Sequence, residues 1–368
     1  MTKKFIWFIM NWNEKTMNGE SSMSNIPVYW KTRLDEVEET LKLVKSGVVT
    51  QPCVSAGGRP IYMLEYGSSN LPQRKANCSS AMGGKDIRCY ADKTGADYVP
   101  TVFLCGCVHG GEFEGTSALL NLIKLIETGT DYNGDKNEEI VELAKRIHLI
   151  IIPMVNPDGR SHIPFDSFVG KTFYDLRYYN QGIWKDGSLC GWPECKQIHP
   201  IKDHVAYLGG YFNDDGVNMM HEDYFGNVSS GTRVVLDVCR NEAPDISILL
   251  HGGDNCTNTL FPVYYISGNA RKEINAFQES YKKLCDENGV RFAPIDVARG
   301  QDDPNVLQSF TLTSAMHHCC GEPTFTFESN QGLCDRGNVI YDYDEIYKAH
   351  MLLFAETVRH VLRRYKMI

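Results

Sequence analysis

The chain has 368 residues and a formal net charge of −9 at pH 7. No block of basic residues interrupts this acidic balance, which argues against a nucleic-acid partner, because phosphate binding needs clustered Lys and Arg. The composition is that of one large soluble protein, and we expect residues 25–368 to form a single domain.

The first 24 residues are predicted to be a loose extension. Two lysines precede the apolar run Phe5–Met10, which imitates the start of a signal peptide. The run is shorter than a signal-peptide core, polar residues follow it at once, and there is no small-residue cleavage site. No stretch approaches the roughly 20 apolar residues of a membrane span. We therefore expect a cytoplasmic protein without a membrane partner.

The next segments predict alternating helices and strands. Apolar residues at three- and four-residue steps from Trp30 to Val44 predict an amphipathic helix that Gly47 ends. Residues 48–55 and 60–66 flank a glycine-rich turn, which predicts a hairpin, and residues 67–100 resemble an insertion. Apolar strands over 101–108 and 147–154 enclose a helix over 114–127. Such a β-α-β unit indicates an α/β fold with a sheet covered on both faces.

Polar residues follow two of the apolar strands. His109 and Glu112 lie three residues apart in the turn after the strand over 101–108, so both side chains can reach one small cation. His251 closes another apolar strand, over residues 245–250, and two glycines follow it. Two histidines and one carboxylate leave a fourth position for water, as in catalytic zinc sites. The sequence therefore predicts one zinc ion per chain.

A third apolar strand, over residues 323–327, delivers Glu328, a carboxylate available as the general base for that water. A lone histidine or glutamate at a strand end is more often a core or capping residue. Here all of these groups fall at carboxyl ends of predicted strands, where open α/β sheets bind ligands. The conjunction favours a hydrolytic zinc centre.

Between these strands, residues 155–230 show little regular pattern, and we expect this long loop region to form a wall over the site. Asn156 and Asp158 are expected to fix the loop beneath the site rather than to contact the substrate. A helix from Tyr343 to about Arg364 closes the chain and is expected to pack on the sheet.

These segments together resemble a known family. In chain order they are Gly58-Arg59-Pro60-Ile61, His109-Gly110-Gly111-Glu112, Asn156-Pro157-Asp158-Gly159, the strand ending in His251, and Thr326-Phe327-Glu328. With them the chain resembles the zinc metallocarboxypeptidases of the carboxypeptidase A type over about residues 27–365. The resemblance implies a three-layer α/β/α fold with a central mixed, twisted, mostly parallel sheet. It implies that His109, Glu112 and His251 are zinc ligands, that Glu328 is the base and proton shuttle, and that the substrate is a peptide or another amide.

The family's clamp for the substrate carboxylate is altered. Its members carry an Asp-x-Asn-Arg-Asn type motif, and here Met220 and His221 stand in place of the Asn and Arg that grip a C-terminal carboxylate. An imidazole is a weaker, pH-dependent substitute for a guanidinium. Capture of a free carboxylate by the usual route is therefore not expected, unless an arginine from elsewhere, such as Arg160, Arg177 or Arg299, restores it.

Two further family residues have no clear counterpart. The arginine that polarises the scissile carbonyl would fall near Lys171, with Arg160 and Arg177 as other candidates, and the sequence does not choose among them. The family's mobile tyrosine is missing, because no Tyr lies between Tyr281 and Tyr341.

Other function classes fit less well. A phosphate-binding loop would need a glycine five positions before Gly170, where Phe165 stands, and a serine hydrolase would need a glycine in place of Leu119. The alternatives that stay open are a small-molecule amide deacylase, a cell-wall-peptide amidase, and a non-catalytic zinc-binding protein, although the last has no need for Glu328. The oligomeric state is left open.

The cysteines suggest a reducing compartment. Their odd total of 13 is spread from Cys53 to Cys334 without a dense framework, which favours reduced thiols. Cys105 and Cys107 are expected in the core. The pair Cys190-x4-Cys195 and the run over residues 317–320 are weaker metal candidates, because neither has a second pair at a zinc-finger spacing.

Overall fold

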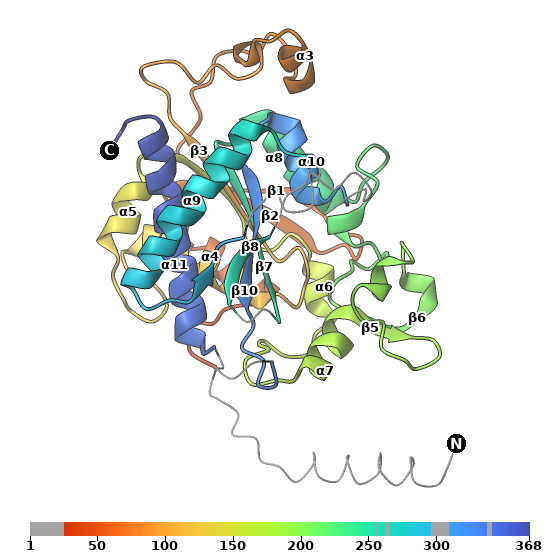
Figure 1. Ribbon diagram of the computed structural model, residues 1–368. Coiled ribbons are helices and arrows are strands. Elements are labelled where there is room, and N and C mark those ends of the chain that lie inside the picture. The colour runs from red at the N-terminus through yellow and green to blue at the C-terminus, as the bar shows by residue number, and fades with distance from the viewer. Residues whose placement is uncertain (1–25, 255–256, 262–264, 296–308, 337–340) are drawn as a thin grey trace, which may run out of the picture.

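The structure is a computed structural model that describes residues 26–254, 257–261, 265–295, 309–336 and 341–368. An eight-stranded mixed sheet runs through it, with helices on both faces (Figure 1). The predicted N-terminal extension and Arg299 lie outside the described residues.

The sheet is mixed, with a parallel centre. Its spatial order is β1-β2-β4-β3-β7-β10-β8-β9. The neighbours from β4 to β10 and the edge pair β8-β9 run parallel, whereas β1-β2, β2-β4 and β10-β8 are antiparallel. The strands are β1 (Gly47–Val54), β2 (Pro60–Tyr66), β3 (Thr101–Gly106), β4 (His148–Ile152), β7 (Ile246–Gly253), β8 (Asn258–Phe261), β9 (Phe292–Ala293) and β10 (Thr324–Asn330).

Two apolar cores lie on the two faces of the sheet, because the central strands are apolar on both sides. One face packs against α4 (Phe113–Thr128), α5 (Glu138–Ala144), α9 (Gly268–Glu287) and α11 (Tyr343–Arg364), and the other against α8 (Ser230–Glu242) and α10 (Leu312–Cys320) (Figure 1). The predicted three-layer α/β architecture is confirmed. Two further helices extend these cores. The helix α2 (Leu34–Leu41) packs beside α4, and α3 (Cys78–Gly83), which lies in the predicted insertion with the 3-10 turn η1 (Ile87–Cys89), packs beside α10.

The loop region between β4 and α8 contains only short elements. A small two-stranded sheet pairs β5 (Gly182–Trp184) with β6 (Val205–Leu208) beside the main sheet (Figure 1). The remaining elements are α6 (Pro157–Ser161), α7 (Phe173–Leu176), the π-helical turn η2 (Arg177–Gln181), and the 3-10 turns η3 (Glu194–Lys196), η4 (Lys202–His204) and η5 (Met219–His221).

Most predicted elements are present, with shifted ends. The helix predicted from Trp30 begins only at Leu34, because Trp30 is instead buried with its indole N–H donating to the carbonyl oxygen of Asp166 at 2.9 Å. The strands β7 and β10 continue past the apolar runs, so His251 and Glu328 lie within strands rather than after them. Within the described residues, no helix is long and apolar enough to cross a membrane.

Candidate metal centre

The register of the parallel strands brings two predicted residues side by side. In the β7–β10 ladder, Glu328 is the partner of His251, and residues paired in this way point to the same face of the sheet. On the other side of β7, β3 ends at Gly106, and the chain turns into α4 through residues 107–112. The carboxyl ends of three adjacent strands therefore meet at one edge of the sheet.

Both glycines of the turn are required by close contacts. A Cβ atom on Gly110 would lie 1.9 Å from the carbonyl carbon of Gly159 and 2.0 Å from the backbone nitrogen of Arg160. A Cβ atom on Gly111 would lie 2.6 Å from Oδ1 of Asn180. The spacing between His109 and Glu112 thus depends on glycines that let the turn pack against the neighbouring loops.

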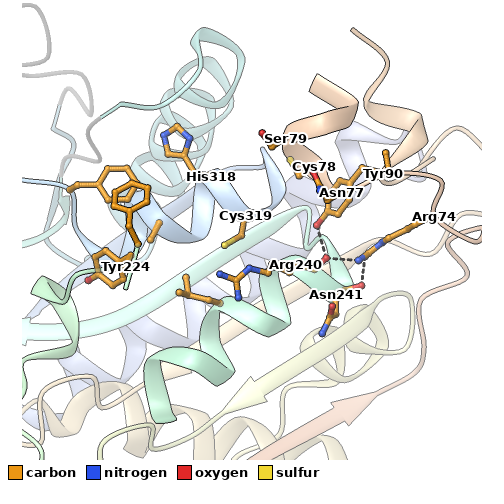
Figure 2. Close-up of a pocket in the computed structure, with 15 residues that line it drawn as sticks. Arg74, Asn77, Cys78, Ser79, Tyr90, Tyr224, Arg240, Asn241, His318 and Cys319 are labelled. Atoms are coloured by element: carbon orange, nitrogen blue, oxygen red, sulfur yellow. Dashed lines mark hydrogen bonds between the residues drawn. The ribbon is translucent and has the colours of Figure 1, made fainter. Parts of the chain in front are cut away.

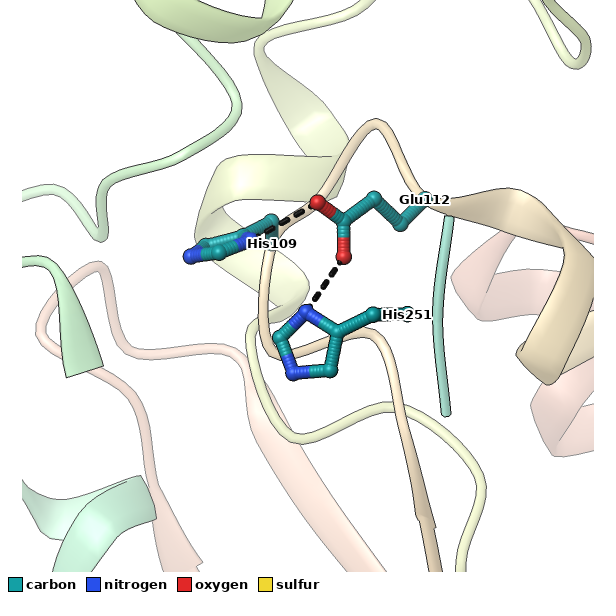
Figure 3. Close-up of side chains that lie close together, drawn as sticks. All are labelled: His109, Glu112 and His251. Carbon is teal, nitrogen blue, oxygen red and sulfur yellow. Dashed lines mark hydrogen bonds and ion pairs between the residues drawn. The ribbon is translucent and has the colours of Figure 1, made fainter. Parts of the chain in front are cut away.

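The turn and β7 bring His109, Glu112 and His251 together (Figure 3). One ligand atom from each of these buried residues lies within 4.8 Å of the other two. Nδ1 of His109 lies 2.7 Å from Oε1 of Glu112, and Nδ1 of His251 lies 2.7 Å from Oε2 of the same carboxylate. The two imidazoles therefore converge on the two oxygens of one side chain.

The chemistry of these donor atoms fits a metal ion. Nε2 of His109 donates to Oδ1 of Asn218 at 3.2 Å, which places the lone pair of a neutral ring on Nδ1, facing a carboxylate oxygen. Oε2 of Glu112 is buried and faces Nδ1 of His251 at 2.7 Å. Lone pairs that face each other inside a protein are costly unless a cation or a proton lies between them.

Burial and charge act in opposite directions on the three groups. Burial would raise the pKa of Glu112, but the two histidines lower it to about 2. Burial lowers the pKa of His109, whereas for His251 the Glu112 carboxylate outweighs burial and raises the pKa. A permanent carboxylate between two imidazoles is a ligand set that zinc prefers.

Two residues that support His109 were missed from the sequence. The side chain of Asn218 accepts from Nε2 of His109, and the ring of Tyr211 stacks on the imidazole at a centroid distance of 3.9 Å and an interplanar angle of 8°. Partners of this kind hold a ligand histidine in one orientation. The Asn218 contact depends on η5, and neither residue has a spacing signal that links it to His109.

Glu328 lies next to this cluster and keeps some solvent exposure. Burial raises its pKa to about 7, with Glu112 acting in the same direction and His251 opposing. A carboxyl group with a pKa near neutral pH suits a group that takes up and returns a proton.

The three basic candidates from the sequence make their contacts elsewhere. Arg160 is buried, donates to the carbonyl oxygens of Thr32 and Ile163 at 3.0 Å, and pairs with Asp166. These contacts hold the Arg160 side chain between α6 and the residues that precede α2.

Lys171 and Arg177 lie against aromatic rings. Nζ of Lys171 lies 4.2 Å from the centroid of Phe165. Arg177 lies over Phe173 at 5.5 Å and 3.8 Å from a carboxylate oxygen of Glu194. None of these contacts reaches the three-residue cluster.

The positions of the altered clamp are apolar and neutral. Met220 is buried, and its backbone N–H donates to Oδ1 of Asn218. Burial, and next the charge of Lys196, lower the pKa of His221 to about 3. A histidine with a pKa this low is neutral at physiological pH.

The turn beneath the site is fixed as expected. Asn156 caps α6 by accepting from the N–H of Gly159 and also donates to the carbonyl oxygen of Val108. Asp158 is fully buried and accepts hydrogen bonds from four donors. These are the hydroxyl of Ser55 at 2.5 Å, the N–H of Gly57 at 3.0 Å, Nη1 of Arg59 at 2.8 Å and the N–H of Asp214 at 3.2 Å.

The weaker metal candidates gather no further ligands within the described residues. Cys190 and Cys195 are buried in a small core with Ile201 and Phe212. In α10, His317 and His318 contact backbone carbonyl oxygens instead. The described cysteines are all free thiols.

A separate cavity of about 700 Å³ lies between the insertion, α8 and α10 (Figure 2). Arg74 crosses one end and donates to the carbonyl oxygens of Arg240 and Asn241, and the hydroxyl of Tyr90 donates to the same oxygen of Arg240 at 2.7 Å. Its described lining includes neither Glu328 nor any member of the three-residue cluster.

The fold recurs in solved structures. The metallo-carboxypeptidase from Burkholderia cenocepacia is 15% identical over 89% of this chain and 67% of its own, with a TM-score of 0.54. Carboxypeptidase A from Helicoverpa armigera is 14% identical over 98% and 82%, with a TM-score of 0.51. Bovine thrombin-activatable fibrinolysis inhibitor, in complex with tick carboxypeptidase inhibitor, is 13% identical over 93% and 100%, also with a TM-score of 0.51.

At such identities these likenesses establish the fold alone, and no curated protein matches the chain. A family model supplies the stronger relation. The model described as zinc carboxypeptidase matches residues 44–288, more than half of the 368 residues, and this span includes all three members of the cluster but ends before β10. The chain therefore belongs to the zinc carboxypeptidase family.

Proposed function

We propose that this protein is a zinc-dependent hydrolase of the metallocarboxypeptidase type that cleaves a peptide or other amide bond. The observation that carries the proposal is the buried cluster of His109, Glu112 and His251 with Glu328 beside it in the strand register. In this proposal the three clustered residues hold one zinc ion per chain. A bound zinc ion supplies Lewis acidity, which polarises a carbonyl group and lowers the pKa of water.

The protein's own part in the reaction is proton transfer and positioning. The carboxylate of Glu328 takes a proton from the attacking water. At the same time the oxygen of that water forms a bond to the amide carbon. Glu328 then returns that proton to the leaving nitrogen as the C–N bond breaks, so that a carboxylic acid and an amine are formed, and the acid's proton passes to the amine or to solvent on release. Asn218 and Tyr211 keep the His109 ring in its orientation throughout.

A small-molecule amide deacylase or a cell-wall-peptide amidase would use the same centre. The apolar Met220 and the neutral His221 at the clamp positions favour these alternatives, since neither side chain attracts a carboxylate. A panel of N-acylated peptides, N-acyl amino acids and γ-glutamyl-diaminopimelate peptides, followed by mass spectrometry, distinguishes them by which bond breaks.

The test of the proposed chemistry is the variant Glu328→Gln. It keeps the size of the side chain but cannot accept a proton, so turnover should fall by about 10²- to 10⁴-fold. Zinc content, measured by plasma mass spectrometry on the same samples, should stay unchanged. Undiminished hydrolysis by the zinc-loaded variant would show that another group is the base.

A further inference from the structure

The loop over residues 190–201 carries a cation that the sequence did not reveal as part of the site. Lys196 ends η3 and is partly buried. Its Nζ lies 4.6 Å from the centroid of the Trp192 ring. No acidic side chain in the described part of the chain forms an ion pair with it, in contrast to Lys93, which has two such partners at 2.8 and 2.9 Å.

This loop is fixed at both ends. Buried Cys190 and Cys195 anchor its start, and the N–H of Cys195 donates to the carbonyl oxygen of Gly191 at 3.0 Å. Further along, Nε2 of His199 accepts from the N–H of Asn218 at 2.9 Å. Because the side chain of Asn218 contacts His109, two hydrogen bonds connect the loop to the candidate metal centre.

The core that buries Cys195, next to Lys196 in the chain, packs against Tyr211, whose ring stacks on His109. This packing places Lys196 beside the candidate metal centre, where its charge lowers the pKa values of Glu328 and His221. Burial lowers the pKa of Lys196 itself, as expected for a cation that lacks a direct counter-ion.

We propose that Lys196 binds a carboxylate of the substrate next to the scissile bond and so determines specificity. The cation comes from the loop over residues 190–201, outside the Met220–His221 segment. A single ammonium group held against an aromatic ring binds a carboxylate as a point charge, without the planar fork of an arginine. This inference rests on the proposed function, because it assigns the substrate-binding group of the same site.

The matched variants are Lys196→Met, which keeps the length without the charge, Lys196→Arg, which restores a cation, and Lys202→Met, which removes an exposed lysine from the same region. The probes are benzoyl-glycyl-phenylalanine and its lysine- and glutamate-terminated analogues, each with a free and an amidated C-terminus. All proteins are zinc-loaded, and kcat and KM are measured separately.

Loss of a charge-assisted hydrogen bond corresponds to about a 10- to 100-fold effect. We expect Lys196→Met to lower kcat/KM by that factor on the free-acid peptides, chiefly through KM, and to change the amides by less than about twofold. Lys196→Arg should recover most of the loss, and Lys202→Met should match the wild type. Equal losses on acids and amides, or no loss on the acids, would overturn the assignment.

Calorimetric binding of the same peptides to zinc-loaded Glu328→Gln protein separates the two proposals. We expect the free-acid peptides to bind more tightly than the amides, and this preference to disappear when Lys196→Met is added. That result supports the carboxylate-binding role of Lys196 even if no peptide is hydrolysed. In that case only the proposed function fails. Equal binding of acids and amides, or no binding of either, contradicts the role of Lys196 whatever the protein hydrolyses.

Discussion

The sheet edge that carries the candidate metal centre and the loop region over residues 155–230 that faces it hold their functional side chains by different means. At the sheet edge, ladder hydrogen bonds fix the register, so that His251 and Glu328 are partners without any help from their side chains. In the loop region, Asn218 and Lys196 depend on capping and loop-to-loop hydrogen bonds. The proposed chemistry thus depends on the part of the fold that is hardest to change, and the proposed substrate contact on the part that changes most easily.

The largest effect should come from Asp158, which joins the loop region to the turn between β1 and β2. Asp158→Ala removes the acceptor of four hydrogen bonds and leaves Arg59 with only Asp214 as partner. Breaking a buried pair of this kind costs about 3–5 kcal/mol. We expect that loss in the free energy of unfolding, measured by denaturant titration.

The control is Asp215→Ala, an exposed neighbour that should change stability by no more than about 0.5 kcal/mol. Equal stabilities for the two variants would mean that Asp158 does not hold the loop region to the turn between β1 and β2.

A smaller effect is expected where a loop residue supports a residue of the cluster. Asn218→Ala removes the acceptor for Nε2 of His109, and loss of such a partner weakens metal binding by about 10- to 100-fold. Competition with a fluorescent zinc chelator measures the affinity. Asn218→Asp keeps an acceptor for both His109 and Met220 and should bind zinc at least as tightly as the wild type. An unchanged zinc affinity in Asn218→Ala would show that the loop region does not contribute to metal binding through Asn218.

The smallest effect concerns the altered clamp. Because its pKa is about 3, His221 gains a proton only far below neutral pH, so it carries no charge between pH 5 and 9. His221→Gln should therefore change kcat/KM by less than about threefold, with the same pH profile as the wild type. A step near pH 6.5 in the wild type that the variant lacks would show that His221 titrates as an ordinary histidine and takes part in substrate binding.

The same contrast explains what the sequence could predict. His109, Glu112, His251 and Glu328 each follow an apolar run, and this pattern was sufficient to place them at one edge of a sheet. Lys196 and Tyr211 follow no such run, because their positions depend on loop contacts between residues far apart in the chain. The strand ends predicted from the apolar runs also came too early, because polar residues continue the hydrogen-bonded ladders of β7 and β10.

The basic candidates illustrate the limit of spacing arguments. Arg160 stands close to the turn over residues 156–159 in sequence, yet its hydrogen bonds go to Thr32, Ile163 and Asp166 on the side of α6 that faces the core. A distance along the chain does not specify the direction of a long side chain. The burial of His221, which keeps its imidazole neutral, likewise depends on neighbours that the local sequence does not contain.

The most direct test of the account is the zinc content of the purified chain and of two single-ligand variants. After dialysis against trace-metal-free buffer, plasma mass spectrometry should find about one zinc ion per wild-type chain. His109→Ala and His251→Ala should each lose most of it, because removal of one of three ligands breaks the coordination set. Full zinc retention in both variants, or a wild-type protein that binds no zinc when zinc is supplied, would contradict the assignment of this cluster as the metal centre.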